Sequence, residues 1–400
     1  MLIAHKIALK PNNKQRTYFF KAAGVARFAY NWALAEWTRQ YEAWKEDNTL
    51  AKPSQMALRR QLNGLKREHF PWMLEVTKNA PQMAIIQLGE AFKNFFAKRN
   101  QYPTFRKKGI YDRFSLTNDQ FQVDGSRIRI PNLGWVRMRE TLRFTGKIMS
   151  ATISRVADRW FVSITVDSQK QFLAAVTENQ GAVGVDLGLS TLATLSTGEV
   201  IRGAKAHRLL LKRLQRLSRR MSKKQKGSQN RKKIQLKLAR LHARITNIRR
   251  DALHKLTSDI SSRFDMIGIE ALHVRGMMKN RRLARSIADM SFYEFRRQVE
   301  YKTERRGGIV IVADRWFASS KICSCCDYKL DILPLSVREW ICPSCHIKHD
   351  RELNAAVNLR NMAVSSTVSA CGEEGAGLGR KTKVKPPSVK QEVNTIATYG

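Results

Sequence analysis

Hydrophobic residues in the first hundred positions recur mainly with the three-to-four-residue period of amphipathic helices. A short alternating stretch at the start predicts one strand, which Pro11 ends, and three helices follow it. The predicted strand and helices cover residues 2–10, 14–46, 54–70 and 80–99. We expect a break in the first helix at Gly24, because glycine disfavours helix interiors. Ser54, which follows a proline, is the expected N-cap of the second helix.

After residue 109 the hydrophobic period changes to two, which is typical of strands. The dipeptide Asp124-Gly125 predicts a hairpin turn. Two more strands are expected on either side of Ala157-Asp158. This strand-rich block ends near residue 175, within the polar linker 168–181.

A new domain is predicted to begin near residue 182, where "AVGVDLGLSTLATLSTG" indicates a strand, a tight turn and a second strand. Residues 205–255 are the most basic part of the chain, and their leucines and isoleucines recur every three or four positions. We predict two antiparallel helices here, joined by the loop 223–233, each with an apolar stripe and basic remaining faces. A buried strand, a basic loop, a helix and another strand are then expected at 264–272, 273–286, 292–307 and 309–314.

The charge balance of the 400 residues is strongly basic, with 73 Lys and Arg against 33 Asp and Glu. Self-repulsion on this scale disfavours compaction unless a polyanion neutralises it, so we expect a nucleic-acid partner. An anionic membrane surface is the other polyanion to consider. However, no apolar run approaches the ~20 residues of a spanning helix, and the first fifteen residues do not resemble a signal peptide. We therefore expect a cytosolic protein without membrane association.

The cysteines are concentrated near the C-terminal end, at Cys323, Cys325, Cys326, Cys342, Cys345 and Cys371. Such clustering points to a metal rather than to a disulfide framework. Two CxxC pairs, separated by fifteen residues, have the spacing of a four-cysteine zinc ribbon. The predicted zinc ligands are Cys323, Cys326, Cys342 and Cys345. A full set of protein ligands predicts a structural zinc, so Cys325 is surplus, and His346 and His349 could replace a ligand but are not needed.

Acidic residues are scarce, yet two of them end apolar strands: Asp186 closes "AVGVD" and Glu270 closes "DMIGIE". A lone aspartate at a strand end is more often a turn or cap residue, but a buried carboxylate is costly unless a cation faces it. A helix that starts at Asp350 or Glu352 could bring a third carboxylate to the same place. Such a group suits magnesium, because oxygen ligands can hold two ions about 3.5–4 Å apart for phosphodiester hydrolysis.

Several stretches together resemble the TnpB family, a transposon-encoded group that is ancestral to type V CRISPR effectors. In the second half of the chain they are "GVDLGLSTLATLSTG", "IGIEAL", "KNRRLARSIADMSFYEFRRQVEYK", "SSKICSCC", "WICPSC" and "HDRELNAAVNLR". Earlier stretches that resemble the family include "QRTYFFKAAGVARFAYNWAL", "PTFRKKG" and "IPNLGWVRM". The match covers nearly all of residues 1–364 in order, so the family assignment is specific.

The resemblance implies an α+β multidomain protein with a RuvC/RNase H-like α/β nuclease domain and a zinc-ribbon insertion. A β-barrel-like wedge domain, interrupted by a helical recognition domain, would precede them. The expected boundaries are 1–12 and 100–175 for the wedge domain, 13–99 for the helical domain, 176–320 and 347–364 for the nuclease domain, 321–346 for the zinc ribbon and 365–400 for a disordered basic tail. The family also implies a guide RNA made from the transposon end, which directs cleavage of double-stranded DNA beside a short transposon-adjacent motif.

Carried over to this chain, the catalytic and magnesium-binding carboxylates would be Asp186, Glu270 and Glu352. The third departs from the family pattern Asp-x-Asn-Ala-Ala, because the chain reads "ELNAA" from Glu352. Glutamate keeps the charge and the oxygen ligands, and other RNase H-like enzymes such as retroviral integrases use a helix-borne glutamate, so we expect an active site. Asp350 is either an accessory ligand or the N-cap of this helix, and the cap is the favoured interpretation.

Nucleic-acid contacts are also predicted outside the acidic residues. Lys78 and Gln82 lie in a stretch that corresponds to a family element touching the adjacent motif, and they are candidate base-edge donors. Nearby Phe92, Phe95 and Phe96 are expected in the core. Further candidates, expected to contact RNA or the guide–target duplex mainly through phosphates, are Arg106, Lys107, Lys108, Arg281, Arg282, Arg285, Arg296 and Arg297.

Three functions follow from the sequence. The leading hypothesis is an RNA-guided DNA endonuclease that uses two magnesium ions. The alternative is a cleavage-defective RNA-guided repressor of the same family, and the remote one is a DDE-like transposase that acts without RNA. We expect a monomer within the ribonucleoprotein, acting on the nucleoid in a prokaryotic cytoplasm.

Overall fold

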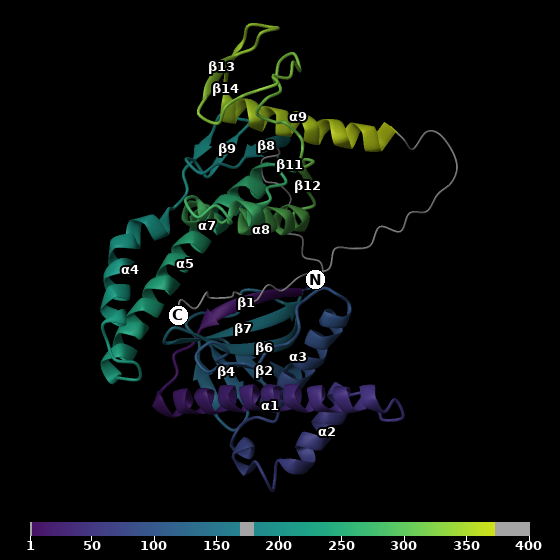
Figure 1. Ribbon diagram of the computed structural model, residues 1–400, viewed down its shortest axis with the longest axis vertical. Coiled ribbons are helices and arrows are strands. Elements are labelled where there is room, and N and C mark those ends of the chain that lie inside the picture. Colours follow the sequence, from purple (N-terminus) through teal and green to yellow (C-terminus); the bar gives the residue numbers. More distant parts are fainter. Residues whose placement is uncertain (1, 169–179, 373–400) are drawn as a thin grey trace. The chain divides into compact units, whose positions relative to one another are not determined.

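A computed structural model describes residues 2–168 and 180–372 (Figure 1). The described residues form two compact units, one within 1–173 and 204–252 and the other within 174–203 and 253–400. Among the described residues, no helix combines the length and the apolar character that are required to cross a bilayer. Each unit has its own sheet and hydrophobic core.

The main sheet of the first unit is antiparallel, with the strand order β1-β7-β6-β2. Its strands are β1 Leu2–Ala8, β2 Arg113–Thr117, β6 Lys147–Val156 and β7 Arg159–Asp167. Val156 pairs with Arg159 across a two-residue turn, in which Ala157 adopts a φ of 56°. The strand pair predicted around Ala157-Asp158 is therefore confirmed.

A smaller antiparallel sheet contains β3 Gln122–Asp124, β4 Arg127–Ile130 and β5 Gly134–Arg137. Asp124 pairs with Arg127, so the turn between them consists of Gly125 and Ser126. Gly125 has a φ of 50°, which glycine adopts without a Cβ clash. The predicted hairpin is confirmed at this position.

Three α-helices and two short 3₁₀ turns complete the N-terminal part: α1 Asn13–Glu46, α2 Gln55–Leu65, α3 Asn79–Phe96, η1 Pro71–Glu75 and η2 Asn118–Gln120. Ser54 caps α2 as predicted, because its side chain accepts a hydrogen bond from the backbone N–H of Ala57 (3.2 Å). The predicted break at Gly24 is wrong, since α1 is continuous through it. Fully buried Ala22 and Ala23 precede this glycine, and packing of this face outweighs a helix penalty of about 1 kcal/mol.

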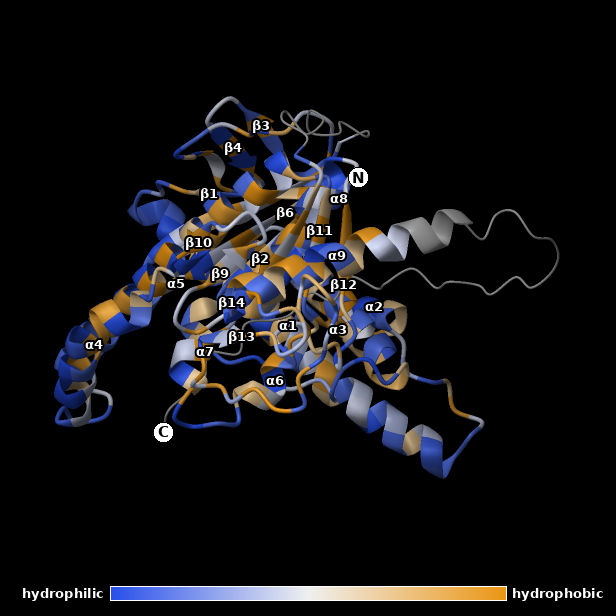
Figure 2. Cartoon of the chain, turned by 90° about the horizontal axis from the view of Figure 1, so that it is seen from above, coloured by the Kyte–Doolittle hydropathy of each residue, from blue (hydrophilic) through white to orange (hydrophobic). Residues whose placement is uncertain are grey.

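The basic stretch after residue 205 forms a helical hairpin of α4 Ala206–Ser222 and α5 Gln229–Arg263, as predicted. Leu217, Leu241 and Ile245 are buried together in a small core between these helices. Much of α4 is hydrophilic by residue, as its blue colour in Figure 2 shows. The last turns of α5, from residue 253, belong to the second unit.

The second unit contains a mixed sheet with the order β10-β9-β8-β11-β12. Its strands are β8 Ala182–Asp186, β9 Ala193–Leu195, β10 Val200–Ile201, β11 Met266–Ile269 and β12 Ile309–Val312. β8, β11 and β12 run parallel, and β9 and β10 are antiparallel to their neighbours. The carboxyl ends of the three parallel strands therefore lie at one edge of the sheet.

Helices α6 Val274–Met277, α7 Ala284–Met290 and α8 Phe292–Arg305 follow β11. The expected basic loop 273–286 is thus partly helical, because it contains α6 and the start of α7. On α8, buried Lys302 donates from Nζ to the Thr257 hydroxyl of α5 (2.7 Å) and to the His254 carbonyl (2.8 Å). Burial lowers the pKa of Lys302 to about 8.

Helix α9, Arg351–Gly372, packs directly on β8 and β11 because both strands carry a glycine under it. A Cβ at Gly184 would lie 1.8 Å from the Ala356 carbonyl oxygen, and one at Gly268 would lie 2.2 Å from that of Leu359. Ala356 and Leu359 are themselves fully buried on this face of α9. Two glycines and a small-residue helix face therefore allow backbone contact, which fixes the position of the helix start.

The region before α9 contains a short hairpin of β13 Glu339–Ile341 and β14 Lys348–Asp350. Helix α9 continues past residue 364, where the ordered chain was expected to end. Residues 373–400, most of the predicted tail, and most of the predicted linker 168–181 lie outside the described residues.

Candidate active site and metal centres

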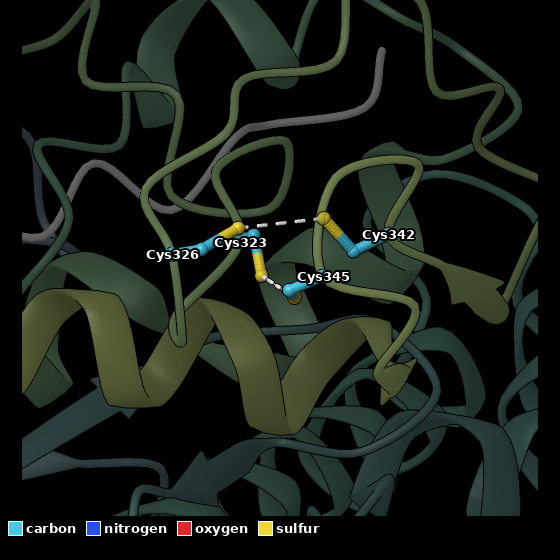
Figure 3. Close-up of side chains that lie close together, drawn as sticks. All are labelled: Cys323, Cys326, Cys342 and Cys345. Carbon is cyan, nitrogen blue, oxygen red and sulfur yellow. Dashed lines mark hydrogen bonds between the residues drawn. The ribbon is translucent and has the colours of Figure 1, made fainter.

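The four predicted zinc ligands converge in the second unit, and their side chains point toward one another (Figure 3). Their sulfur atoms all lie within 4.8 Å of one another. The Sγ atoms of Cys323 and Cys345 are 3.5 Å apart, and those of Cys326 and Cys342 are 3.6 Å apart. Four thiols at this spacing suit a tetrahedral zinc ion with no open position.

The other possible zinc ligands near this site are not part of the four-sulfur group. Cys325 is exposed and is not part of the four-sulfur group. His349 is buried with its Nε2 3.0 Å from the Cys323 Sγ, so it contacts a ligand instead of replacing one. Its ring also packs on Trp340, with centroids 4.8 Å apart. His346 is exposed.

The three predicted catalytic carboxylates come from the ends of two neighbouring parallel strands and the start of α9. Val185 pairs with Ile269, so Asp186 and Glu270, the next residues, leave the sheet at the same level. Glu352 lies in the first turn of α9, whose Gly184 and Gly268 contacts place it beside that edge. We call Asp186, Glu270 and Glu352 the acidic edge.

Within the acidic edge, the pKa of Asp186 is strongly raised. Loss of solvent, together with the negative charges of Glu270 and Glu352, raises the pKa of Asp186 to about 8. Arg351 acts in the opposite direction, and Asp350 adds a smaller repulsion. Glu270 and Glu352 are therefore close enough to Asp186 to oppose its ionisation. Perturbed carboxyl groups of this kind cluster at functional sites.

Glu352 is held by groups from two sides. Its Oε2 accepts a hydrogen bond from the Thr191 hydroxyl (3.0 Å), and its Oε1 pairs with Arg338 Nη1 (2.9 Å). Arg338 lies between the two cysteine pairs, and the Arg351 backbone N–H donates to its carbonyl oxygen (2.8 Å). Sequence reasoning missed Arg338, because nothing in its local sequence indicates that it reaches the acidic edge.

Glu270 is held by Ser319, whose buried hydroxyl donates to Oε1 (2.5 Å). Two asparagines on α9 hold the adjoining segment: Asn358 Nδ2 donates to the Ser319 carbonyl (2.8 Å), and Asn354 Nδ2 donates to the Ile322 carbonyl (2.7 Å). Both asparagines are buried. The segment leading into the first cysteine pair is thus fixed to α9 and to Glu270.

The acidic edge matches magnesium in ligand type, since it offers three carboxylates whose repulsion a cation would relieve. Within the described residues, however, the four cysteines are the only acidic, histidine or cysteine group with all ligand atoms within 4.8 Å. Carboxylate side chains would therefore have to rotate to share an ion. Asp350 caps α9 as favoured from the sequence, because its Oδ1 accepts from the Leu353 N–H (2.8 Å).

The residues predicted to contact nucleic acid differ in whether their side chains are exposed or already bound within the protein. Arg106 packs inside the first unit, with its guanidinium 3.6 Å from the Tyr30 ring centroid and bonded to Gln87 (3.0 Å). Burial lowers the pKa of Arg106 to about 10. Arg296 and Arg297 form salt bridges within α8. Gln82 is partly buried, and the exposed candidates are Lys78, Lys107, Lys108, Arg281, Arg282 and Arg285.

The phenylalanines near Gln82 are not all in the core. Phe92 is buried and Phe95 is partly buried against the core of the first unit. Phe96 is 53% exposed, so its expected core position is wrong. It lies at the last residue of α3, where the helix leaves the packed face.

The α4–α5 hairpin adds a basic surface that no single predicted residue identified. Two shallow grooves of about 370 and 410 Å³ lie on it. Their lining residues are Lys212, Arg213, Gln215, Arg216, Leu217, Arg219, Arg220, Lys223, Lys237, Arg240, Leu241 and Arg244. As described, neither groove has an acidic lining residue, so the hairpin offers phosphates a continuous set of cations.

Family models match three parts of the chain. One described as a probable transposase (OrfB_IS605) matches residues 162–281, one described as a Cas12f1-like TNB domain matches 292–359, and a helix-turn-helix domain model matches 1–46. The TNB match contains all four clustered cysteines, Arg338 and Glu352.

Relatives cover nearly the whole chain. A Streptomyces pristinaespiralis protein, provisionally named an RNA-guided DNA endonuclease, is 37% identical over 97% of this chain and 96% of its own. InsQ of Escherichia coli K12, with the same provisional name, is 33% identical over 98% of both chains.

A solved structure shares the fold. Cas12f1, in a cryo-EM complex with sgRNA and target DNA, aligns with a TM-score of 0.53 at 14% identity, over 87% of this chain and 83% of its own. At this identity the likeness concerns the fold, a mixed α+β architecture with a RuvC region and a four-cysteine TNB domain.

Proposed function

Because the chain belongs to the TnpB (OrfB_IS605) family, we propose that it is an RNA-guided DNA endonuclease. Its partners would be a guide RNA from the transposon end and a double-stranded DNA target, in keeping with the sgRNA and target DNA of the Cas12f1 complex. The observation that carries the proposal is the acidic edge, where Glu270 and Glu352 oppose the ionisation of Asp186. Three carboxylates grouped at one edge of a sheet, in a chain with few acids, suit the binding of metal cations.

Asp186, Glu270 and Glu352 would hold magnesium at the acidic edge. Magnesium bound there would activate water and stabilise the leaving oxygen of a phosphodiester. Asp186 has to lose its proton first, since a pKa of about 8 keeps it largely neutral at pH 7. A nearby divalent cation favours that deprotonation, which couples ion binding to ionisation of the edge.

The surrounding residues orient the carboxylates. Ser319 fixes one oxygen of Glu270, and Thr191 fixes one oxygen of Glu352. Arg338 occupies the other oxygen of Glu352, so ligation through that oxygen would displace its guanidinium. The zinc would act structurally, because it holds the loop that carries Arg338 and the segment that Asn354 and Asn358 bind.

Nucleic-acid binding would involve both units. We assign phosphate contacts to the α4–α5 hairpin and to the exposed basic residues named above, and adjacent-motif contacts to Lys78 and Gln82. The packed position of Arg106 favours a role in supporting its loop over direct RNA contact. The wedge, helical, nuclease and zinc-ribbon boundaries given above remain our proposal for the domain organisation.

The test is plasmid cleavage by a ribonucleoprotein made by co-expression with the transposon-end RNA. We expect magnesium-dependent cutting of a guide-matched plasmid by the wild type, and target binding without cutting by Asp186→Ala and Glu352→Ala. Asp350→Ala should still cut, because Asp350 caps the helix. Normal cutting by Glu352→Ala together with loss in Asp350→Ala would contradict this assignment, and cutting without RNA would contradict RNA guidance.

A repressor is the second candidate, and the glutamate at position 352 favours it, since the family pattern has aspartate there. In that case the wild-type complex would bind the matched plasmid and leave it intact. Restoration of cutting by Glu352→Asp would identify the longer side chain as the cause.

A further inference from the structure

A short loop beside the acidic edge is anchored at both ends to the last residue of β11, Ile269, and to Glu270, which directly follows it. At its start, the Ala313 N–H donates to the Ile269 carbonyl (2.8 Å). At its end, the Ser319 hydroxyl donates to Glu270 Oε1 (2.5 Å). Residues 313–319, which we call the Trp316 loop, are thus anchored at both ends to two consecutive residues at the carboxyl end of β11.

Trp316 stands in the middle of this loop with 81% of its surface exposed. Asp314 fixes the turn, because its Oδ1 accepts from the Trp316 N–H (2.8 Å) and its carbonyl accepts from the Phe317 N–H (3.0 Å). A single exposed hydrophobic residue is common and means little by itself. Here, however, the indole lies on a hydrogen-bonded turn, and the loop that contains this turn is anchored to Glu270, a proposed catalytic carboxylate.

A positively charged side chain, that of Arg315, lies next to the indole of Trp316. The Arg315 guanidinium lies 5.3 Å from the Trp316 ring centroid, and its Nη2 is 3.4 Å from His273 Nδ1. Arg315 is exposed, and no acidic side chain in the described part of the chain pairs with it. An aromatic face and an available guanidinium side by side are what proteins use to hold a single-stranded nucleotide, the base on the ring and the phosphate on the cation.

We propose that Trp316 and Arg315 form a subsite for one unpaired nucleotide of the DNA strand that enters the acidic edge. Trp316 stacks on the base, and Arg315 contacts a phosphate close to the one that is cut. Stacking tolerates any base, which suits an enzyme whose target is chosen by pairing with a guide. The position of this nucleotide beside the cleaved phosphate rests on the proposed nuclease function, whereas stacking of its base on Trp316 can be tested by binding alone.

An abasic scan provides the main test. One abasic nucleotide is moved along the cleaved strand of a guide-matched target, and cleavage rates are measured for wild type, Trp316→Ala, Trp316→Phe and Trp316→Leu. At one position we expect the missing base to slow the wild type about 5- to 150-fold, the equivalent of a stacking contribution of ~1–3 kcal/mol. Trp316→Ala should cut intact DNA slower by a similar factor and should be insensitive to the abasic position.

The two other variants separate stacking from a purely hydrophobic surface. Trp316→Phe keeps an aromatic face and should retain most of the rate, whereas Trp316→Leu should behave like Trp316→Ala. All three should have the wild-type midpoint of thermal unfolding, because the residue is exposed. An unchanged abasic profile in Trp316→Ala, or a wild-type rate in Trp316→Leu, would overturn the subsite; the latter would indicate a hydrophobic docking surface for a protein.

A binding measurement separates this proposal from the proposed function. The Asp186→Ala complex is loaded with target DNA that contains 2-aminopurine, whose fluorescence falls when it stacks on an indole. We expect quenching at the abasic-sensitive position, and its loss when Trp316→Ala is added. If the wild type cuts no matched DNA, the nuclease function fails, yet Trp316-dependent quenching still supports the subsite. Cutting without such quenching rejects the subsite alone.

Discussion

The raised pKa of Asp186 predicts that the Asp186→Asn variant is more stable than the wild type in magnesium-free buffer near pH 8. A carboxyl group whose folded pKa exceeds its unfolded value stabilises the fold at low pH, and this contribution is lost as pH rises through the folded pKa. For Asp186 the loss spans the range from 3.8 to about 8. Asparagine stays neutral throughout, so the difference between the two proteins should grow with pH.

The magnitude follows from the same two values. A rise in pKa from 3.8 to about 8 corresponds to on the order of 6 kcal/mol above pH 8, at about 1.4 kcal/mol for each tenfold change. Water entry and side-chain movement lower such penalties in real proteins, so we expect ~2 kcal/mol. For the second unit this amounts to a higher unfolding midpoint by about 4–8 °C.

The assay is thermal unfolding of the two zinc-loaded proteins in magnesium-free buffer without chelator, at about pH 5 and about pH 8, followed by addition of magnesium. The difference in unfolding midpoint between Asp186→Asn and the wild type should be small at the lower pH and large at the higher pH. Magnesium should reduce this difference, because it stabilises the ionised wild type. Asp331→Asn, which changes an exposed aspartate between the two cysteine pairs, is the matched control and should show no such pH dependence. Equal midpoints at about pH 8 would refute the raised pKa of Asp186.

Three further predictions concern the supports of the site. Gly184→Ala should displace α9 and lower cleavage by ~100-fold or more, since its Cβ would lie 1.8 Å from a backbone oxygen; Gly64→Ala, with no atom within 4 Å of its Cβ, should cut normally. Asn358→Asp should lower the unfolding free energy by about 1–3 kcal/mol in a denaturant titration, because two carbonyls lose their donor, and equal stability would contradict this contact. A strong chelator should release one zinc per chain, seen by elemental analysis, and should abolish cutting until zinc is restored; Cys325→Ser should keep its zinc, and loss of it would contradict the ligand set.

Local sequence patterns predicted the helices, strands and turns well, because each of these patterns depends only on residues that are close together in the sequence. The alternation through β6 and β7, the helical period of α4 and α5 and the glycine turn at Gly125 all depend on local geometry. Gly24 was misjudged for the complementary reason: its helix is held by packing with distant residues, which a local propensity does not contain. The resemblance to the TnpB family is confirmed by relatives that span nearly the entire chain.

The candidate site was predictable only in part. The convergence of the four cysteines followed from their spacing, and the possible meeting of Asp186 and Glu270 followed from their positions at the ends of two apolar strands. The parallel pairing that brings them to the same edge was seen only in the structure. The catalytic roles of the acidic edge stay predictions, as does its magnesium. Ser319, Arg338 and the two asparagines of α9 were not identified as supports, because hydrogen bonds across tens of residues leave no periodic signal in the sequence.

The backbone contact between α9 and the two strand glycines limits how this protein can diversify. A helix seated so tightly cannot slide or tilt to suit a new side chain, and any enlargement beneath it would dislodge the whole element. The side chain at position 352 does not contribute to this backbone contact, because Glu352 is held by Thr191 and Arg338 instead. An acid of different length can therefore stand there while the helix keeps its seat on the two strands.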